Sequence, residues 1–192
     1  MFTGIIEKKS SILSVDGGKF TVENHFGSDL KVGRSIAHDG ACMTIESFND
    51  NAYSFFVMEE SLNKTNFGNK RPGGYFNIAR CFKAEDRVDG HFVSGHIDIS
   101  GVVSSLDKKT DGSLIVGVDF SEEFSKFTIK KGSIAINGVS LTVVDKKPAY
   151  ISVSLIPLTQ DWTNLGDLQV GESVNLEFDM LGKYILNMHH DS

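Results

Sequence analysis

Short runs of β-branched and aromatic residues recur along this chain, and Gly, Asn, Asp and Lys separate them. Runs of this kind, bounded by turn-forming residues, are typical of β-strands joined by short turns. The three prolines, Pro72, Pro148 and Pro157, lie near the ends of such runs, where a missing backbone donor costs little. We therefore predict strands at residues 19–24, 35–45, 52–58, 75–80, 91–103, 113–120, 133–143, 150–156 and 173–178.

Helical signals are few and short. Ser121 precedes Glu122 and Glu123, the pattern of a capping serine with acidic residues in the first helical turn. Residues 59–68 and 159–166 each predict one or two helical turns that end at a glycine.

The chain contains an internal repeat with an offset of 98 residues. The stretch SIAINGVSLTV at 133–143 repeats SIAHDGACMTI at 35–45, and TNLG at 163–166 repeats TNFG at 65–68. Fixed-spacing similarity is the sequence signature of a duplicated structural unit. Near the start of each copy, Gly4 matches Gly101, one residue out of phase.

The repeat and the strand pattern together predict an all-β fold. About six short strands in each copy are the pattern of a small closed barrel, which removes exposed sheet edges. We predict two tandem six-stranded antiparallel closed β-barrels with a short C-terminal helix. The predicted boundaries are 1–94 for the first barrel, 95–179 for the second, and 180–192 for the helix and tail.

The C-terminal segment has a helical rather than a strand pattern. Its apolar residues fall one and four apart and form a single stripe, which comprises Met180, Leu181, Tyr184, Ile185 and Met188. A helix this short is marginal on its own in water, so it must dock on another surface. Because both barrels would already be closed, we favour a neighbouring subunit over a barrel of the same chain.

Composition excludes several classes of function. Of the 192 residues, 40% are apolar and 23% charged, which is ordinary for a globular chain. The net charge of −6 argues against a nucleic-acid surface, which needs a basic face. No apolar run approaches the length of a membrane span, and the first residues lack the pattern of a secretory signal. Two cysteines make no disulfide framework, so we expect a cytoplasmic protein without nucleic-acid or membrane partners.

The polar residues that the two copies share predict a pair of like pockets. Ser35 recurs as Ser133, and Thr44 recurs as Thr142 inside an apolar run. An unpaired hydroxyl buried in such a run is costly, which favours a polar pocket in each copy and therefore two copies of one ligand. The repeated Asn66 is better explained as a turn residue.

Reactive residues differ between the copies. Cys42 faces Ser140, Cys81 faces Asp179, and Lys131 faces Val32, while the segment that carries His91 and His96 has no counterpart. A site built from similar halves with different reactive groups would bind two like molecules and treat them differently. One molecule could then act as donor and the other as acceptor.

Other kinds of chemistry fit the sequence less well. His91 and His96 would point to opposite faces of a strand, so a shared metal ion is disfavoured and we expect no metal. His38 is expected to be a structural histidine. The chain has no GxGxxG or P-loop motif and no strand–turn–helix elbow around a serine.

Several motifs together resemble one known family. MFTGIIE, GRSIAHDGACMTI, MEESLNKTNFG, DGHFVSGHID, KKGSIAINGVSLTV, SLIPLTQDWTNLG and VNLEFDMLGKY are similar, in order and spacing, to the alpha-type riboflavin synthases. The resemblance implies two six-stranded barrels, a homotrimer, and a reaction without cofactor. In that reaction one 6,7-dimethyl-8-ribityllumazine gives a four-carbon unit to a second, yielding riboflavin and 5-amino-6-(D-ribitylamino)uracil. It also implies a site between the first barrel of one subunit and the second barrel of its neighbour.

The resemblance also implies roles for individual residues. The catalytic positions of the family fall on Phe2, Ser35, Cys42, His96, Lys131 and Asp179. His96 is assigned to proton transfer, because an imidazole titrates near neutral pH. Cys42 acts as a nucleophile or as a polar wall. Asp179 orients a nucleophile or stabilises developing positive charge, with Ser35 as a hydrogen-bonding partner.

A wider binding shell follows from the same resemblance. In the first copy it comprises Gly4, Ile5, Ile6, Cys42, Met43, Thr44, Phe56, Val57, Met58, Glu59, Glu60 and Ser61. In the second copy it comprises Gly95, His96, Ile97, Lys131, Ser140, Leu141, Thr142, Ile156, Pro157, Leu158, Thr159, Gln160 and Asp161. The alternative function is a lumazine or flavin carrier on the same fold that lacks catalysis.

Overall fold

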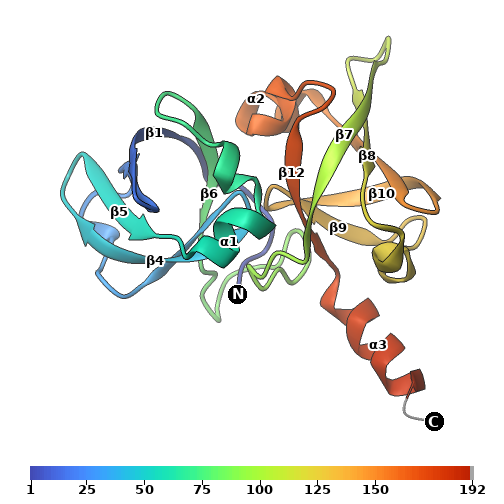
Figure 1. Cartoon of the computed structure of the whole chain (residues 1–192), viewed down its shortest axis with the longest axis horizontal. Coiled ribbons are helices and arrows are strands. Elements are labelled where there is room, and N and C mark those ends of the chain that lie inside the picture. Colours follow the sequence, from blue (N-terminus) through green and yellow to red (C-terminus); the bar gives the residue numbers. More distant parts are fainter. Residues whose placement is uncertain (191–192) are drawn as a thin grey trace.

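Two closed antiparallel barrels make up most of the molecule, as the computed structural model shows (Figure 1). It describes residues 1–190, with side chains up to Met188. The first barrel is ordered β1-β2-β5-β4-β3-β6 and the second β10-β11-β8-β7-β12-β9. The strands of the first are β1 (Lys8–Asp16), β2 (Lys19–Glu23), β3 (Ser35–His38), β4 (Ala41–Phe48), β5 (Ala52–Phe56) and β6 (Tyr75–Arg80). Those of the second are β7 (Ile99–Lys108), β8 (Leu114–Asp119), β9 (Ser133–Ile136), β10 (Val139–Lys147), β11 (Tyr150–Leu155) and β12 (Ser173–Phe178). The predicted fold class is confirmed.

Short helices connect the strands at equivalent places in each copy. Between β5 and β6 lie α1 (Glu59–Lys64) and η2 (Asn66–Asn69), and between β11 and β12 lie α2 (Pro157–Trp162) and η4 (Asn164–Asp167). Both predicted helical segments are therefore confirmed. The remaining short helices are η1 (Gly27–Asp29) and η3 (Glu122–Phe127). Ser121 is the N-cap residue of η3 and two acidic residues follow it, as predicted, but its hydroxyl accepts no helix amide and donates instead to the Glu123 carboxylate.

The C-terminal helix α3 (Met180–His190) projects away from the second barrel (Figure 1). Residues 191–192 of the predicted tail lie outside the described residues. Leu181, Tyr184 and Ile185 are 62%, 69% and 57% exposed, so the apolar stripe of this helix faces solvent in the single chain. None of the helices along residues 1–190 has the length and apolar character that a membrane crossing requires.

Each barrel has its own apolar core, but the two cores are filled differently. Four phenylalanines, Phe20, Phe55, Phe67 and Phe76, pack together in the first, with ring centroids 4.8 to 6.4 Å apart. The second core is mostly Val, Ile and Leu. His38 is fully buried among the aromatic rings, 4.0 Å from the Phe55 centroid, as expected of a structural histidine.

Strand β1 is absent from the sequence prediction, because a polar residue occupies one of its buried positions. Ser10 is 0% exposed, and its hydroxyl donates to the Glu23 carbonyl at 2.8 Å. Leu13 in the same strand is exposed. The alternation of apolar and polar residues that marks a half-buried strand is therefore broken.

The predicted strand at 91–103 is wrong in its first half. Residues 91–98 form an extended loop with a single bridge, from Phe2 to Val93, and β7 starts only at Ile99. Gly95 has φ +85°, which interrupts the extended backbone. The argument that His91 and His96 point to opposite faces of a strand therefore does not apply.

The segment in front of each barrel packs on the other barrel. Ile6, which precedes β1, belongs to the core of the second barrel, and Ile97, which precedes β7, packs against the core of the first. The Ser140 amide donates to the Gly4 carbonyl at 2.7 Å, and the Cys42 amide donates to the Gly95 carbonyl at 2.8 Å. The two copies thus exchange their first residues.

This exchange corrects the alignment of the repeat. Because Gly4 and Gly95 make equivalent contacts, the partner of Gly4 is Gly95 and not Gly101. Lys8 and Ser35 begin strands 27 positions apart, whereas Ile99 and Ser133 begin the equivalent strands 34 positions apart. The 98-residue offset therefore holds only from the third strand of each copy onward.

A buried polar network joins the two barrels at their pseudo-twofold axis. Asp39 and Asn137 lie in tight hairpin turns with φ +43° and +44°. The glycines that follow them, Gly40 and Gly138, pack directly against each other. Side-chain oxygens of Asn175 and Asn77 accept from the backbone amides of Asn66 and Asn164, both at 2.7 Å. The repeated Asn66 therefore ties the barrels together and is more than a turn residue.

Candidate functional site: two equivalent patches

The outer face of the β3–β4 hairpin carries three of the predicted site residues. Ser35 pairs with Thr44 across the two strands, and Cys42 lies two pairs further along, opposite Ala37. Ile36 and Ile45 point into the core instead, because successive side chains of a strand alternate between faces. Ser35 and Cys42 are half-buried and Thr44 is exposed.

The second barrel presents the same face with different chemistry. Ser133 pairs with Thr142, and Ser140 takes the place of Cys42, opposite Ala135. Thr142 is exposed like Thr44, so the expectation of buried hydroxyls is wrong. Both hydroxyls lie on the outside of a closed barrel, where a bound molecule can reach them. We call these two faces the cysteine patch and the serine patch.

The exchanged segments cover the edges of these patches. A Cβ on Gly95 would lie 2.6 Å from the Cys42 Cβ and 2.9 Å from Phe2, so only glycine allows this approach. A Cβ on Gly4 would lie 2.6 Å from the Ser140 Cβ. The predicted grouping of the binding shell is therefore wrong in one respect. Residues 95–97 adjoin the first barrel's residues, and residues 4–6 adjoin those of the second.

The cysteine patch brings Phe2, Cys42 and Gly95 into contact. Phe2 is buried and packs with Cys42 in a small cluster that includes Val93. His96 follows Gly95 directly, and its side chain is exposed next to this contact. Both cysteines of the chain are free thiols, so Cys42 is available as a polar or nucleophilic group.

The serine patch contains a histidine that sequence reasoning did not assign to the site. His91 Nδ1 lies 2.7 Å from the Ser140 hydroxyl. Burial lowers the pKa of His91, and the nearby Asp179 carboxylate partly opposes this shift. A neutral imidazole beside a hydroxyl can accept its proton. The available signal was that the other copy has no histidine that corresponds to His91.

Lys131 adopts a backbone conformation that is uncommon for residues other than glycine. Its φ is +69°, and its amide donates to the Val143 carbonyl at 2.9 Å. Gly33 has φ +82° and makes the equivalent bond to Ile45, so Lys131 corresponds to Gly33 and not to Val32. A left-handed conformation of this kind costs on the order of 1 kcal/mol and is frequent at functional sites.

Helices α1 and α2 follow β5 and β11, the strands that pair with β4 and β10 of the two patches. Exposed apolar side chains lie at the ends of β5 and β11 and on α2, namely Phe56, Met58, Ile156, Leu158 and Trp162. Glu59 and Glu60 form the first turn of α1. Val57 is 1% exposed and fills the first core, so only its backbone can face a ligand.

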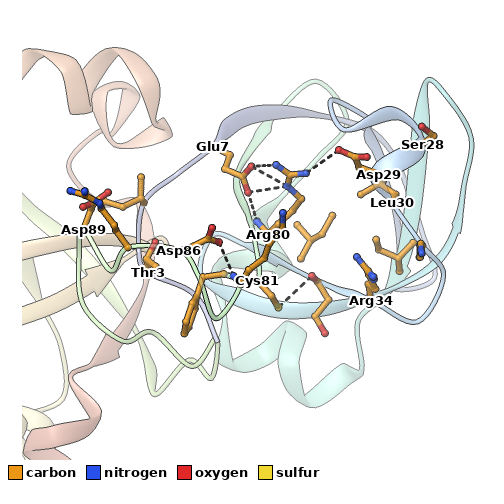
Figure 2. A pocket seen from close by; sticks show the side chains of 18 residues that line it. Thr3, Glu7, Ser28, Asp29, Leu30, Arg34, Arg80, Cys81, Asp86 and Asp89 are labelled. Atoms are coloured by element: carbon orange, nitrogen blue, oxygen red, sulfur yellow. Dashed lines mark hydrogen bonds and ion pairs between the residues drawn. The ribbon is translucent and has the colours of Figure 1, made fainter.

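A cavity of about 1010 Å³, lined by both charged and apolar side chains, adjoins the first barrel on the side of Ser35 and Ile5 (Figure 2). Arg80 and Glu7 both line this cavity, and the Arg80 guanidinium donates to the Glu7 carboxylate from Nε at 3.0 Å and from Nη2 at 2.6 Å. Cys81, the counterpart of Asp179, also lies here, with its thiol 3.7 Å from the Ser35 carbonyl. Of the predicted residues, only Ser35 and Ile5 line this cavity.

Comparisons with known proteins agree with this architecture. Residues 3–80 and 94–179 both match the lumazine binding domain family. A riboflavin synthase from Actinobacillus pleuropneumoniae is 39% identical over 190 residues, covering 96% of this chain and 88% of that protein. A riboflavin synthase from Escherichia coli (strain K12) is 34% identical, covering 93% and 87%. The crystal structure of LumP complexed with riboflavin has a TM-score of 0.85 at 20% identity, covers 93% of this chain and 99% of that chain, and shows the same fold.

Fold and family match together define a duplicated lumazine-binding barrel. Within that class, the chain belongs to the riboflavin synthase family, as its full-length relatives show. The resemblance carried by the sequence motifs is thus confirmed.

Proposed function

We propose that this chain catalyses the dismutation of two 6,7-dimethyl-8-ribityllumazine molecules into riboflavin and 5-amino-6-(D-ribitylamino)uracil. The observation that carries the proposal is identity of 34–39% to riboflavin synthases over 93–99% of the chain. The duplicated fold adds support, because two equivalent patches suit two identical substrates. The reaction transfers a four-carbon unit and needs no cofactor.

The unlike residues of the two patches would give the two substrates different roles. At the cysteine patch, His96 would move a proton and Cys42 would act as nucleophile or polar wall. At the serine patch, Ser140 with His91 would exchange a proton with the second lumazine, while Lys131 and Asp179 would balance charge. Holding both rings in reacting geometry can lower the activation free energy by several kcal/mol, since effective molarities reach roughly 10⁵ M.

The assembly proposed for this reaction is a homotrimer in the cytoplasm. The cysteine patch of one subunit would face the serine patch of its neighbour, so that the two lumazines meet across the interface. The exposed apolar stripe of α3 supports a subunit contact, because monomers rarely leave such a surface open. Light scattering at micromolar concentration tests this, and Tyr184→Asp with Ile185→Asp should give a smaller species. A wild-type monomer would contradict the trimer.

The proposed activity is tested by mixing the protein with 6,7-dimethyl-8-ribityllumazine and following riboflavin by fluorescence and chromatography. We expect one riboflavin for every two lumazines consumed, with release of the ribitylaminouracil. Stable lumazine emission without conversion would instead support the carrier function. Absence of both conversion and binding would reject the assignment altogether.

A further inference from the structure

A buried carboxylate outside the predicted site holds the segment that carries His96. Glu177 lies on β12 of the second barrel and is 2% exposed. Its Oε1 accepts from the Ser94 amide at 2.6 Å and from the Ser94 hydroxyl at 2.7 Å, and its Oε2 accepts from the Gly95 amide at 2.9 Å. Three donors converge on one carboxylate, and hydrogen bonds to a charged acceptor are stronger than neutral ones.

The turn held by Glu177 is the one that touches Cys42. The Gly95 carbonyl accepts from the Cys42 amide, while the Ser94 hydroxyl also accepts from the His96 amide at 3.2 Å. A carboxylate of the second barrel therefore fixes the backbone on both sides of the Gly95–Cys42 contact. His96 is the next residue, so its position relative to Cys42 depends on this anchor.

The first copy shows that the fold itself does not require this carboxylate. Ala79 occupies the position equivalent to Glu177, since each pairs with an alanine of the neighbouring strand, Ala37 or Ala135. The equivalent turn at Gly4 nevertheless docks on Ser140 with a 2.7 Å hydrogen bond. In that turn Ile5 takes the place of His96. Both copies exchange their first segments, but only the copy whose turn carries His96 has a buried carboxylate behind that turn.

Burial of this carboxylate has a free-energy cost. Desolvation raises the pKa of Glu177, and the hydrogen bonds from Ser94 and Gly95 oppose that rise. An alanine of the first copy serves the equivalent position without such a cost. A costly buried charge in only one of two equivalent places favours a role in the chemistry of that place.

We propose that Glu177 is a positioning residue, which fixes the Ser94–Gly95 turn and thereby aligns His96 with Cys42 on the cysteine patch. This proposal deepens the proposed riboflavin synthase function, and the role of Glu177 in turnover rests on that function. Glu177 acts through the turn and does not touch substrate.

The first test is Glu177→Gln, which preserves the size of the side chain but turns a donor toward the Gly95 amide. We expect kcat for riboflavin formation to fall by about tenfold or more, because small misplacements of reacting groups are costly, while KM changes by less than about threefold. Ser94→Ala, which removes one of the three donors, should give a smaller loss in the same direction. Glu172→Gln is the matched control, since Glu172 is exposed and its carboxylate accepts from the Gln169 amide; its kinetics should equal those of wild type.

A double variant separates positioning from general destabilisation. In a His96→Gln background, Glu177→Gln should cause little further loss of kcat, since both changes disable the same group. Losses that multiply would overturn the proposal, as would an unchanged kcat in Glu177→Gln.

A second measurement does not depend on turnover. In a Cys81→Ser background, a thiol reagent should label Cys42 about tenfold faster when Glu177 is replaced by Gln, because the covering turn opens more often. Equal labelling rates would reject the positioning role even if the enzyme is active. A wild-type protein that converts no lumazine would reject the proposed function, while the labelling result would still decide the role of Glu177. If Glu177→Gln does not fold, Ser94→Ala in the same two assays decides it.

Discussion

Replacing Gly95 by alanine should damage the cysteine patch far more than the same change at Gly73. Both glycines have φ +85°, so the backbone strain of an added Cβ is matched. At Gly73 a Cβ would meet nothing within 4 Å, whereas at Gly95 it would lie 2.6 Å from the Cys42 Cβ and 2.9 Å from Phe2. The comparison therefore isolates the close approach from the strain.

The expected loss of unfolding free energy has two contributions, backbone strain and overpacking. A left-handed alanine costs on the order of 1–2 kcal/mol, and this should be the whole effect of Gly73→Ala. Overpacking against Cys42 and Phe2 adds roughly 1–3 kcal/mol, so Gly95→Ala should lose about 2–5 kcal/mol of unfolding free energy. Because the protein relieves the overlap by moving the 94–97 segment, kcat should also fall, while Gly73→Ala should retain wild-type kcat.

Urea unfolding at one fixed protein concentration measures the free energies, and the lumazine assay measures kcat. A fixed concentration is needed because subunit association shifts apparent stability. Equal losses of stability in the two variants would refute the close approach of Gly95 to Cys42. A destabilised Gly95→Ala with full kcat would refute the view that this contact aligns the patch.

Three further predictions concern the core, the network and the serine patch. Burial lowers the pKa of His38 to about 3 from an ordinary value of 6.5, so between these pH values the unfolded chain binds a proton that the folded chain does not. The unfolding free energy should therefore fall as the pH drops below 6.5, by about 2 kcal/mol at pH 5, and urea unfolding of His38→Gln should lose this pH dependence. Asp39→Asn removes the buried partner of Lys70, 2.6 Å away, and should cost about 3 kcal/mol in the same unfolding assay, whereas a neutral result would contradict a structural role for the charge. His91→Phe removes the group 2.7 Å from the Ser140 hydroxyl and should lower kcat by about tenfold or more, and an unchanged kcat would exclude His91 from the chemistry.

Most strands and the duplication were predictable because both leave local signals, although the single strands predicted at 35–45 and 133–143 are each a hairpin of two strands. Alternating burial produces alternating apolar and polar residues in the sequence, as in β2, where Phe20 and Val22 are fully buried and the residues beside them are not. Strand β1 was not predictable in this way, because the buried Ser10 is satisfied by Glu23, a residue on another strand. A hydroxyl whose partner is distant in sequence leaves no periodic signal.

The chemistry-bearing residues were predictable as a set, but their arrangement was not. Comparing the copies identifies Cys42 and Ser140 as unlike residues at one equivalent position. It does not show that Gly95 covers Cys42 while Gly4 covers Ser140, because seven more residues in the second copy shift the register between the first and third strands. Thr44 was expected to be buried because its neighbours are apolar, yet the closed barrel turns alternate side chains outward.

The exchange of segments makes the two copies dependent on each other. Ile6 completes the second core and Ile97 packs on the first, so neither barrel is finished by its own sequence alone. The near-symmetric network around Asp39 and Asn137 then joins the two barrels through hydrogen bonds such as those from Asn66 to Asn175 and from Asn164 to Asn77. On this frame, single substitutions at equivalent places, such as Ser140 for Cys42 and Glu177 for Ala79, give the two patches different chemistry without changing the fold.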